Sequence, residues 1–103
     1  MDEKYIGYEE LEAGHNYPRL RDNLAALPYP HKDKIIHYLL DGEIEAAKVS
    51  RDRDIFTGKL IPTEVLIMSD GTFLWCNVLA YYIDKYNLRL PKDFEEHILS
   101  HSK

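Results

Sequence analysis

The clearest hydrophobic pattern lies over residues 64–76, where two runs of apolar and β-branched side chains flank the dipeptide Asp70-Gly71. An Asp-Gly pair in this position predicts a two-residue hairpin turn, because both turn residues take positive φ. The expected register places Ser69 opposite Thr72. Side chains alternate along strands, so both faces of the hairpin are expected to be apolar. One face carries Val65, Ile67, Leu74 and Cys76, and the other carries Leu66, Met68, Phe73 and Trp75.

Four segments outside the hairpin space their apolar residues three and four positions apart, which is typical of helices. They begin at about residues 18, 30, 78 and 91. Asn77 is expected to be an N-cap, and Gly42 and Asn87 are expected to be left-handed C-caps. A partial alternation over residues 43–50 predicts one more strand.

The order helix, helix, three strands, helix, helix predicts an α+β fold. We expect a small antiparallel sheet of about three strands around a central Asp-Gly hairpin, flanked by N-terminal and C-terminal helices. A hairpin that is apolar on both faces needs cover on both sides. The sequence leaves open whether that cover comes from the chain's own helices or from another protein.

The chain has 103 residues, which predicts one domain, and its charge is uneven. Residues 1–14 hold five carboxylates against Lys4, a balance of −4 within a net charge of −5. We therefore expect an acidic, loosely ordered leader over 1–16 and a single α+β domain over 17–103. An acidic leader suits a basic partner, or serves only as a solvated segment. The remaining chain has no basic stripe, so we expect no binding to nucleic acid.

No apolar run approaches the roughly 18 to 20 residues that span a bilayer, so we expect no membrane partner. The first residues lack the basic-then-apolar layout of a signal peptide. Cys76 is the single cysteine and has no partner for an internal disulfide. Together these features predict a cytoplasmic protein.

Two features offer candidate chemistry, and each also has a structural interpretation. Cys76 precedes an expected helix start, which lowers a thiol pKa, but its apolar hairpin face predicts burial. His97 and His101 share one helix face, as metal ligands do, yet no third ligand lies nearby in the sequence. A small metal- or thiol-dependent hydrolase is therefore the least favoured function. We expect no catalytic residues, no metal and no cofactor.

Two further features favour recognition of a protein. Asp52 and Asp54 alternate with arginines in a polar segment, which is typical of a solvated loop or an interface rim. The chain also holds eight tyrosines, a residue type that is favoured at protein interfaces. Tyr81 and Tyr82 point about 100° apart on a helix, so we expect Tyr81 to reach the surface or a partner.

Three segments resemble small uncharacterised bacterial proteins, some of the toxin-immunity type. They are residues 38–42 (Tyr-Leu-Leu-Asp-Gly), 54–62 and the run from Ser69 to Pro91. The resemblance covers about residues 28–99 and leaves the acidic leader unmatched. It implies a small, acidic, cytoplasmic binder that blocks a toxin by occupying its active surface, and it transfers no contact residue.

The sequence thus predicts a non-catalytic protein-binding module, in its narrower form an immunity-like protein that neutralises a basic toxin domain. The expected partner contacts are Glu9, Glu10, Asp52, Asp54, Trp75 and Tyr81. The main alternative is a homo-oligomeric structural or regulatory protein, in which a spare hairpin face pairs with a second copy across a two-fold axis.

Overall fold

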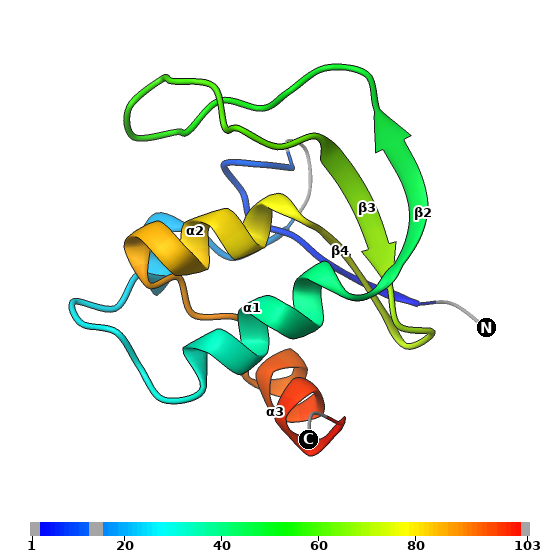
Figure 1. Ribbon diagram of the computed structural model, residues 1–103. Helices are drawn as coiled ribbons and strands as arrows, with labels where there is room; N and C mark the ends of the chain where they lie inside the picture. The colour runs from blue at the N-terminus through cyan, green and yellow to red at the C-terminus, as the bar shows by residue number, and fades with distance from the viewer. Residues whose placement is uncertain (1–2, 13–15, 102–103) are drawn as a thin grey trace.

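The computed structural model describes residues 3–12 and 16–101, and these form an α+β fold with a mixed sheet and three α-helices (Figure 1). The strands are β1 (Lys4–Ile6), β2 (Glu43–Lys48), β3 (Val65–Ser69) and β4 (Phe73–Cys76). The helices are the short 3-10 turn η1 (Arg21–Asn23), α1 (Lys32–Leu40), α2 (Val78–Tyr86) and α3 (Lys92–His101). The sheet order is β1-β4-β3-β2. Within the described part of the chain, no helix has both the length and the apolar character to cross a membrane.

β3 and β4 pair antiparallel, but their register differs from the expected one. Ser69 pairs with Leu74 rather than with Thr72. The reason lies in the turn, where Asp70 Oδ1 accepts the backbone N–H groups of Thr72 and Phe73 at 2.9 and 2.7 Å. This moves the turn one residue along the chain. The register shifts by an even number of residues, so each side chain stays on its expected face.

The segment expected to be a loosely ordered leader contributes a strand. β1 runs parallel to β4, with Ile6 opposite Trp75, and this makes the sheet four-stranded and mixed rather than three-stranded and antiparallel. Tyr8 follows β1 into the core and donates its hydroxyl to the Arg89 carbonyl at 2.7 Å. A strand of three residues is too short to show alternation, and its partner lies far along the chain. Pattern reasoning therefore missed it.

The chain itself covers one face of the β3–β4 hairpin almost completely and the other in part, since Ile67 and Leu74 on the second face are only half-buried. α1 and α3 cover one face, where Trp75 donates its indole N–H to the Leu39 carbonyl at 3.0 Å and lies 5.3 Å from the ring of Phe94. On the other face, Ile67 and Cys76 share a small cavity with Tyr5 and Leu11 from the N-terminal segment.

The expected helix over 18–26 is reduced to the 3-10 turn η1. Leu24 leaves the helical region, with φ −92° and ψ 130°, and forms an isolated bridge with Leu88. The Ala25 N–H bonds to the Asn87 carbonyl at 3.0 Å, and the Arg89 N–H bonds to the Asn23 carbonyl at 2.7 Å. Extended pairing with the segment after α2 has replaced the helix.

Three expected caps have different outcomes. Asn87 has φ 58°, so the left-handed cap after α2 is confirmed. Asn77 occupies the N-cap position, but its side chain bonds to the backbone of Leu66 and Glu64 and joins α2 to β3. Gly42 does not have positive φ. It is required for space instead, because a Cβ there would lie 2.8 Å from the Trp75 ring.

Candidate functional site

A long loop between β2 and β3, residues 49–64, is attached to α2 through one buried carboxylate. The side chain that attaches it is Asp54, which is 1% exposed. Tyr81 and Tyr86 lie on α2 and donate their hydroxyls to Asp54 Oδ2 at 2.7 and 2.6 Å. Tyr82 adds a third bond, because its hydroxyl accepts the Ile55 N–H at 3.1 Å. The loop is therefore fixed to the helix by side-chain hydrogen bonds rather than by regular secondary structure.

The other carboxylate oxygen of Asp54 shapes the loop. Asp54 Oδ1 accepts the N–H groups of Phe56 and Thr57 at 2.7 and 3.2 Å. Burial alone would raise the pKa of Asp54, but hydrogen bonds from Tyr86, Tyr81 and these backbone groups outweigh burial and lower it. The same bonds, followed by desolvation, raise the pKa of both tyrosines to about 12. The site holds a charged carboxylate and neutral phenols at pH 7.

Three aromatic rings at this attachment form one surface, which we call the aromatic patch: Phe56, Tyr81 and Tyr86. Phe56 is 37% exposed, and its ring lies 4.6 Å from that of Tyr86. The buried ring of Tyr82 supports the patch from below, 5.4 Å from Tyr81 and nearly perpendicular to it. Because the two tyrosine hydroxyls are held by Asp54, the rings are oriented before any partner arrives.

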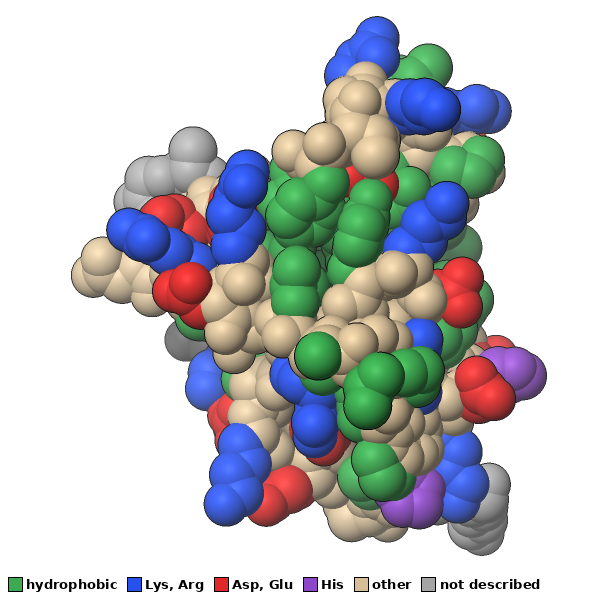
Figure 2. All heavy atoms as spheres, turned by 90° about the vertical axis from the view of Figure 1, so that its left-hand side faces the viewer, with side chains coloured by type: hydrophobic (Ala, Val, Ile, Leu, Met, Phe, Trp, Pro, Cys, Tyr) green, Lys and Arg blue, Asp and Glu red, His purple; other side chains and the backbone are tan. Residues whose placement is uncertain are grey.

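Cations lie over two of these rings. The guanidinium of Arg21 lies 5.3 Å from the Phe56 ring centre, and the Lys85 ammonium lies 5.7 Å from that of Tyr81. These distances are in the range of cation–π attraction. Figure 2 shows hydrophobic side chains in the upper half of this face with Lys and Arg side chains around them.

Two more cations, Arg53 and Lys59, belong to the same loop. Arg53 donates to the Gly58 carbonyl at 2.9 Å, and both side chains lie on exposed residues. We define the basic rim as Arg21, Arg53, Lys59 and Lys85. Among the described residues, only Arg21 of this set is in an ion pair, 3.5 Å from Glu10. Three charges of the rim therefore have no carboxylate partner within residues 3–12 and 16–101.

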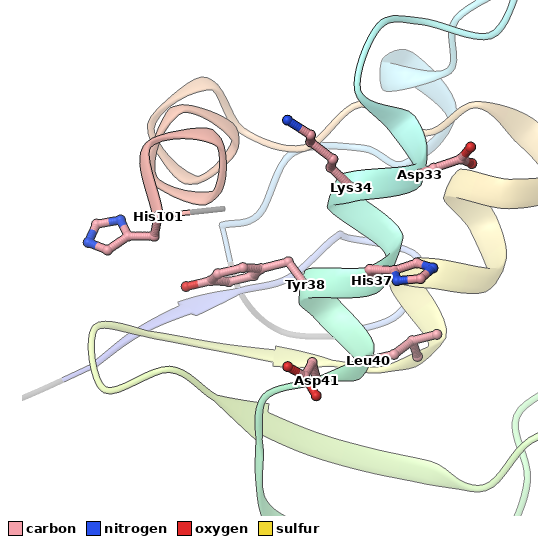
Figure 3. Close-up of a pocket in the computed structure, with 7 residues that line it drawn as sticks. All are labelled: Asp33, Lys34, His37, Tyr38, Leu40, Asp41 and His101. Carbon is pink, nitrogen blue, oxygen red and sulfur yellow. The ribbon is translucent and has the colours of Figure 1, made fainter. Parts of the chain in front are cut away.

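A second region is an open groove of about 870 Å³ around α1, shown in Figure 3. Its lining is Asp33, Lys34, His37, Tyr38, Leu40, Asp41 and His101. Lys34 and Tyr38 point toward α3, whereas His37 and Leu40 point to the opposite side of α1. These side chains do not converge on one point, so the groove offers no defined binding centre.

Beside this groove, Asp70 joins α1 and α3 to the hairpin. Its Oδ2 accepts the Tyr38 hydroxyl at 2.5 Å and lies 2.9 Å from His97 Nε2. Burial raises the pKa of Asp70, but bonds from Tyr38, the turn backbone and His97 outweigh burial and lower it. Both of its oxygens are occupied by partners from the chain. Asp70 is therefore a structural junction.

The residues considered for catalysis lie in inert surroundings. Cys76 is buried, and burial raises its pKa more than the backbone N–H of Val78 lowers it. The rings of His97 and His101 lie 4.3 Å apart, but His101 Nδ1 is 2.8 Å from the His97 carbonyl. Over residues 3–12 and 16–101, no set of three or more His, Cys, Asp or Glu could hold a metal ion.

Of the six expected contact residues, the structure brings together Asp54 and Tyr81, which are hydrogen-bonded. Asp54 is too deeply buried to touch a partner and acts through the tyrosines it holds. Trp75 is 0% exposed, since α1 and α3 cover the hairpin face that carries it. Asp52 lines the small cavity beside Cys76.

The two glutamates from the acidic leader are engaged within the chain. Glu10 accepts the backbone N–H groups of Leu20 and Arg21 at 2.6 and 3.0 Å, at the start of η1. Glu9 is exposed and lies 3.5 Å from Arg19. Neither one is part of the aromatic patch. The segment is expected to steer a basic partner toward the chain, but the rings of the aromatic patch come from other segments.

Sequence reasoning missed Phe56, Tyr86 and the whole basic rim. One signal was available: Tyr82 and Tyr86 are four apart on a helix, so both face the same neighbour. Phe56, Arg21 and Lys85 come from three separate elements, and no spacing rule brings them together.

Comparisons with protein-family models, curated proteins and solved structures find no match for this chain.

Proposed function

We propose that this chain is a non-catalytic protein-binding module whose contact surface is the aromatic patch with its basic rim. The observation that carries the proposal is the fixed orientation of two half-buried tyrosine rings by buried Asp54, beside the exposed ring of Phe56. Aromatic side chains and arginine are enriched at protein interfaces, where they supply large contact areas. A surface that is already ordered loses little conformational entropy on binding.

The surroundings of the chain's polar groups support a binding role over a catalytic one. Among the described residues, every buried side-chain nitrogen and oxygen has a hydrogen-bond partner. Enzymes leave reactive groups poised toward a substrate, often with strongly shifted pKa values. Here the carboxylates with lowered pKa values are all occupied by partners from the same chain: Glu10, Asp54, Asp70 and Asp93.

A narrower form of the proposal is an immunity-type protein that occupies the surface of a toxin domain in the cytoplasm. The resemblance over residues 28–99 supports it, and so does the single cysteine, which stays reduced in that compartment. Two steps test this form: a search for a toxin gene beside this one, and co-expression of the chain with the toxin domain that such a gene encodes. Cells should survive with the wild-type chain and die when the aromatic patch is removed.

The general proposal is tested by copurification from the native host with tagged variants. Phe56→Ala removes the most exposed ring of the patch, and the control Leu27→Ala removes an even more exposed apolar side chain elsewhere. A specific partner should be retained by the wild-type chain and by Leu27→Ala and lost by Phe56→Ala. Both variants must melt like the wild type. The proposal fails if no protein depends on Phe56.

A second candidate function, homo-oligomerisation, is favoured by the edge strand β2. All six of its residues are exposed, and the strand has a neighbour on only one side. Unpaired edge strands can add a strand from another chain, although the irregular pairing at Glu45 and the charges of Glu43 and Lys48 oppose this. Sedimentation should show a dimer that Ile44→Lys disrupts if this function holds, and a monomer if it does not.

A further inference from the structure

Resting on the proposed function, we infer that the partner presents an acidic protein segment, whose carboxylates lie against the basic rim while an apolar or aromatic side chain covers Phe56. The occupant is thus a peptide segment rich in Asp and Glu. The acidic composition of the leader suggests a basic partner instead.

The unpaired charges of the basic rim favour an acidic segment. Arg53, Lys59 and Lys85 have no ion-pair partner among the described residues. The carboxylate of Asp54, in the same loop, is buried and already accepts four hydrogen bonds, and the carboxylate of Glu10 lies 3.5 Å from Arg21. Three cations without an ion pair in the described part of the chain therefore belong to the loop and the helix that carry the aromatic patch, on a chain of net charge −5. Complementary charge across an interface selects partners and speeds their encounter.

The position of Arg21 also favours an acidic segment. Its guanidinium lies over Phe56 and 3.5 Å from Glu10, so one side of the group is already used. Glu10 in turn has both oxygens engaged by the backbone of Leu20 and Arg21. An arginine stacked on a ring presents its remaining N–H groups in a fixed plane that matches a carboxylate.

Two other occupants fit less well. A basic partner would place its cations against the rim, and three of the leader's four described carboxylates are engaged within the chain: Glu10 with the backbone, Glu9 with Arg19, and Glu3 with the Ser69 hydroxyl. A nucleic acid also pairs with cations and rings, but binding it depends on an extended positive surface. This rim is a small patch on a protein of net charge −5, which repels a long polyanion at a distance.

The experiment is photo-crosslinking in the native host. A benzophenone amino acid replaces Thr57, which is exposed and adjacent to Phe56, and the matched control carries it at Ser100, an exposed hydroxyl residue on α3. Mass spectrometry identifies the peptide joined to each position. The Thr57 probe should capture a protein through a segment rich in Asp and Glu, and the Ser100 probe should not capture it.

The failures separate the two proposals. A captured protein whose joined segment is neutral or basic overturns the acidic partner and leaves the protein-binding function standing. Capture of nucleic acid, or no capture above the Ser100 control, overturns both.

The captured segment is then made as a synthetic peptide and titrated against purified protein. The double variant Arg53→Glu, Lys59→Glu should weaken binding by about tenfold or more, as expected for lost and reversed charge pairs. Lys34→Glu, Lys92→Glu makes the same change in net charge away from the patch and should leave affinity within about twofold. Equal effects of the two variants would mean that only net charge matters, and would overturn a defined acidic contact.

Discussion

The hydroxyl of Tyr86 donates a 2.6 Å hydrogen bond to the carboxylate of Asp54, although 32 residues separate the two in sequence. This bond and its companion from Tyr81 join an irregular loop to a rigid helix. The loop supplies Phe56 and two cations, and the helix supplies two rings and Lys85. Without this junction, the aromatic patch and the basic rim would not be one surface.

Replacing the buried carboxylate should therefore cost more stability than its size suggests. Asp54→Ala leaves two phenol hydroxyls and two backbone N–H groups without their acceptor, and we expect the free energy of unfolding to fall by about 2–4 kcal/mol. The control, Asp22→Ala, removes an exposed carboxylate from η1 and should change stability by no more than about 0.5 kcal/mol. Urea unfolding followed by circular dichroism measures both. Equal losses would show that Asp54 does not anchor the loop.

The same junction should be visible in the titration of its tyrosines. Tyr81 and Tyr86 have pKa values raised to about 12, first by their bonds to Asp54 and then by desolvation. At about pH 11 they should be mostly neutral, whereas phenols near the ordinary value of about 10 are mostly ionised. Asp54→Asn removes the negative charge and should move both toward the ordinary value.

NMR of tyrosine ring carbons at residue resolution reads this titration directly. Tyr38 is the internal control, because its pKa is raised by burial and by its bond to Asp70 and should not respond to Asp54→Asn. Unchanged titration of Tyr81 and Tyr86 in the variant would show that the bonds in the structure do not persist in solution.

Acid stability should depend on Asp70. Its pKa is lower in the folded chain than in the unfolded chain, because bonds from Tyr38, the turn backbone and His97 outweigh burial. A carboxyl with a lowered folded pKa stabilises the fold fully above its unfolded value, near 3.9, and loses that contribution as pH falls toward the folded value. Between about pH 5 and pH 2, the wild type should therefore lose more stability than Asp70→Asn. Parallel curves for the two proteins would exclude this contribution.

Sequence reasoning placed correctly those elements that depend on short-range signals. Alternation placed β3 and β4, helical spacing placed α2 and α3, and the Asn87 cap follows from a local backbone preference. Signals of this kind lie within a few neighbouring residues. The Asp70 turn was recognised, yet its register was wrong because the side chain, rather than the backbone, accepts the closing bonds.

The parts that escaped prediction depend on distant residues. β1 exists because β4 offers it an edge, and η1 stays short because Leu24 pairs with Leu88. At the candidate site, the sequence predicts Asp54 and Tyr81 as two separate surface contacts. Composition alone does not show which carboxylate is buried. Trp75 is expected at an interface because of its residue type, but it is completely buried in the core.

Gly42 gives the sharpest test of the packing beneath the hairpin. A Cβ at this position would lie 2.8 Å from Trp75 Cζ2 and 3.0 Å from the Ser69 carbonyl oxygen. The indole has little freedom to move, since it is completely buried and bonded to the Leu39 carbonyl. We expect Gly42→Ala to destabilise the fold by about 1–3 kcal/mol through overpacking, and to alter the fluorescence of the single tryptophan.

Gly58→Ala separates this effect from backbone strain. Gly58 has φ +75° and open space around it, so an alanine there meets strain of about 1–2 kcal/mol but no clash. The tryptophan emission of the Gly58→Ala variant should match that of the wild type. Combining Gly42→Ala with Trp75→Phe should recover part of the loss, because the smaller ring vacates the position of Cζ2 and the two changes are then not additive. Strict additivity in urea unfolding would mean that Gly42 is required by the backbone and not by the indole.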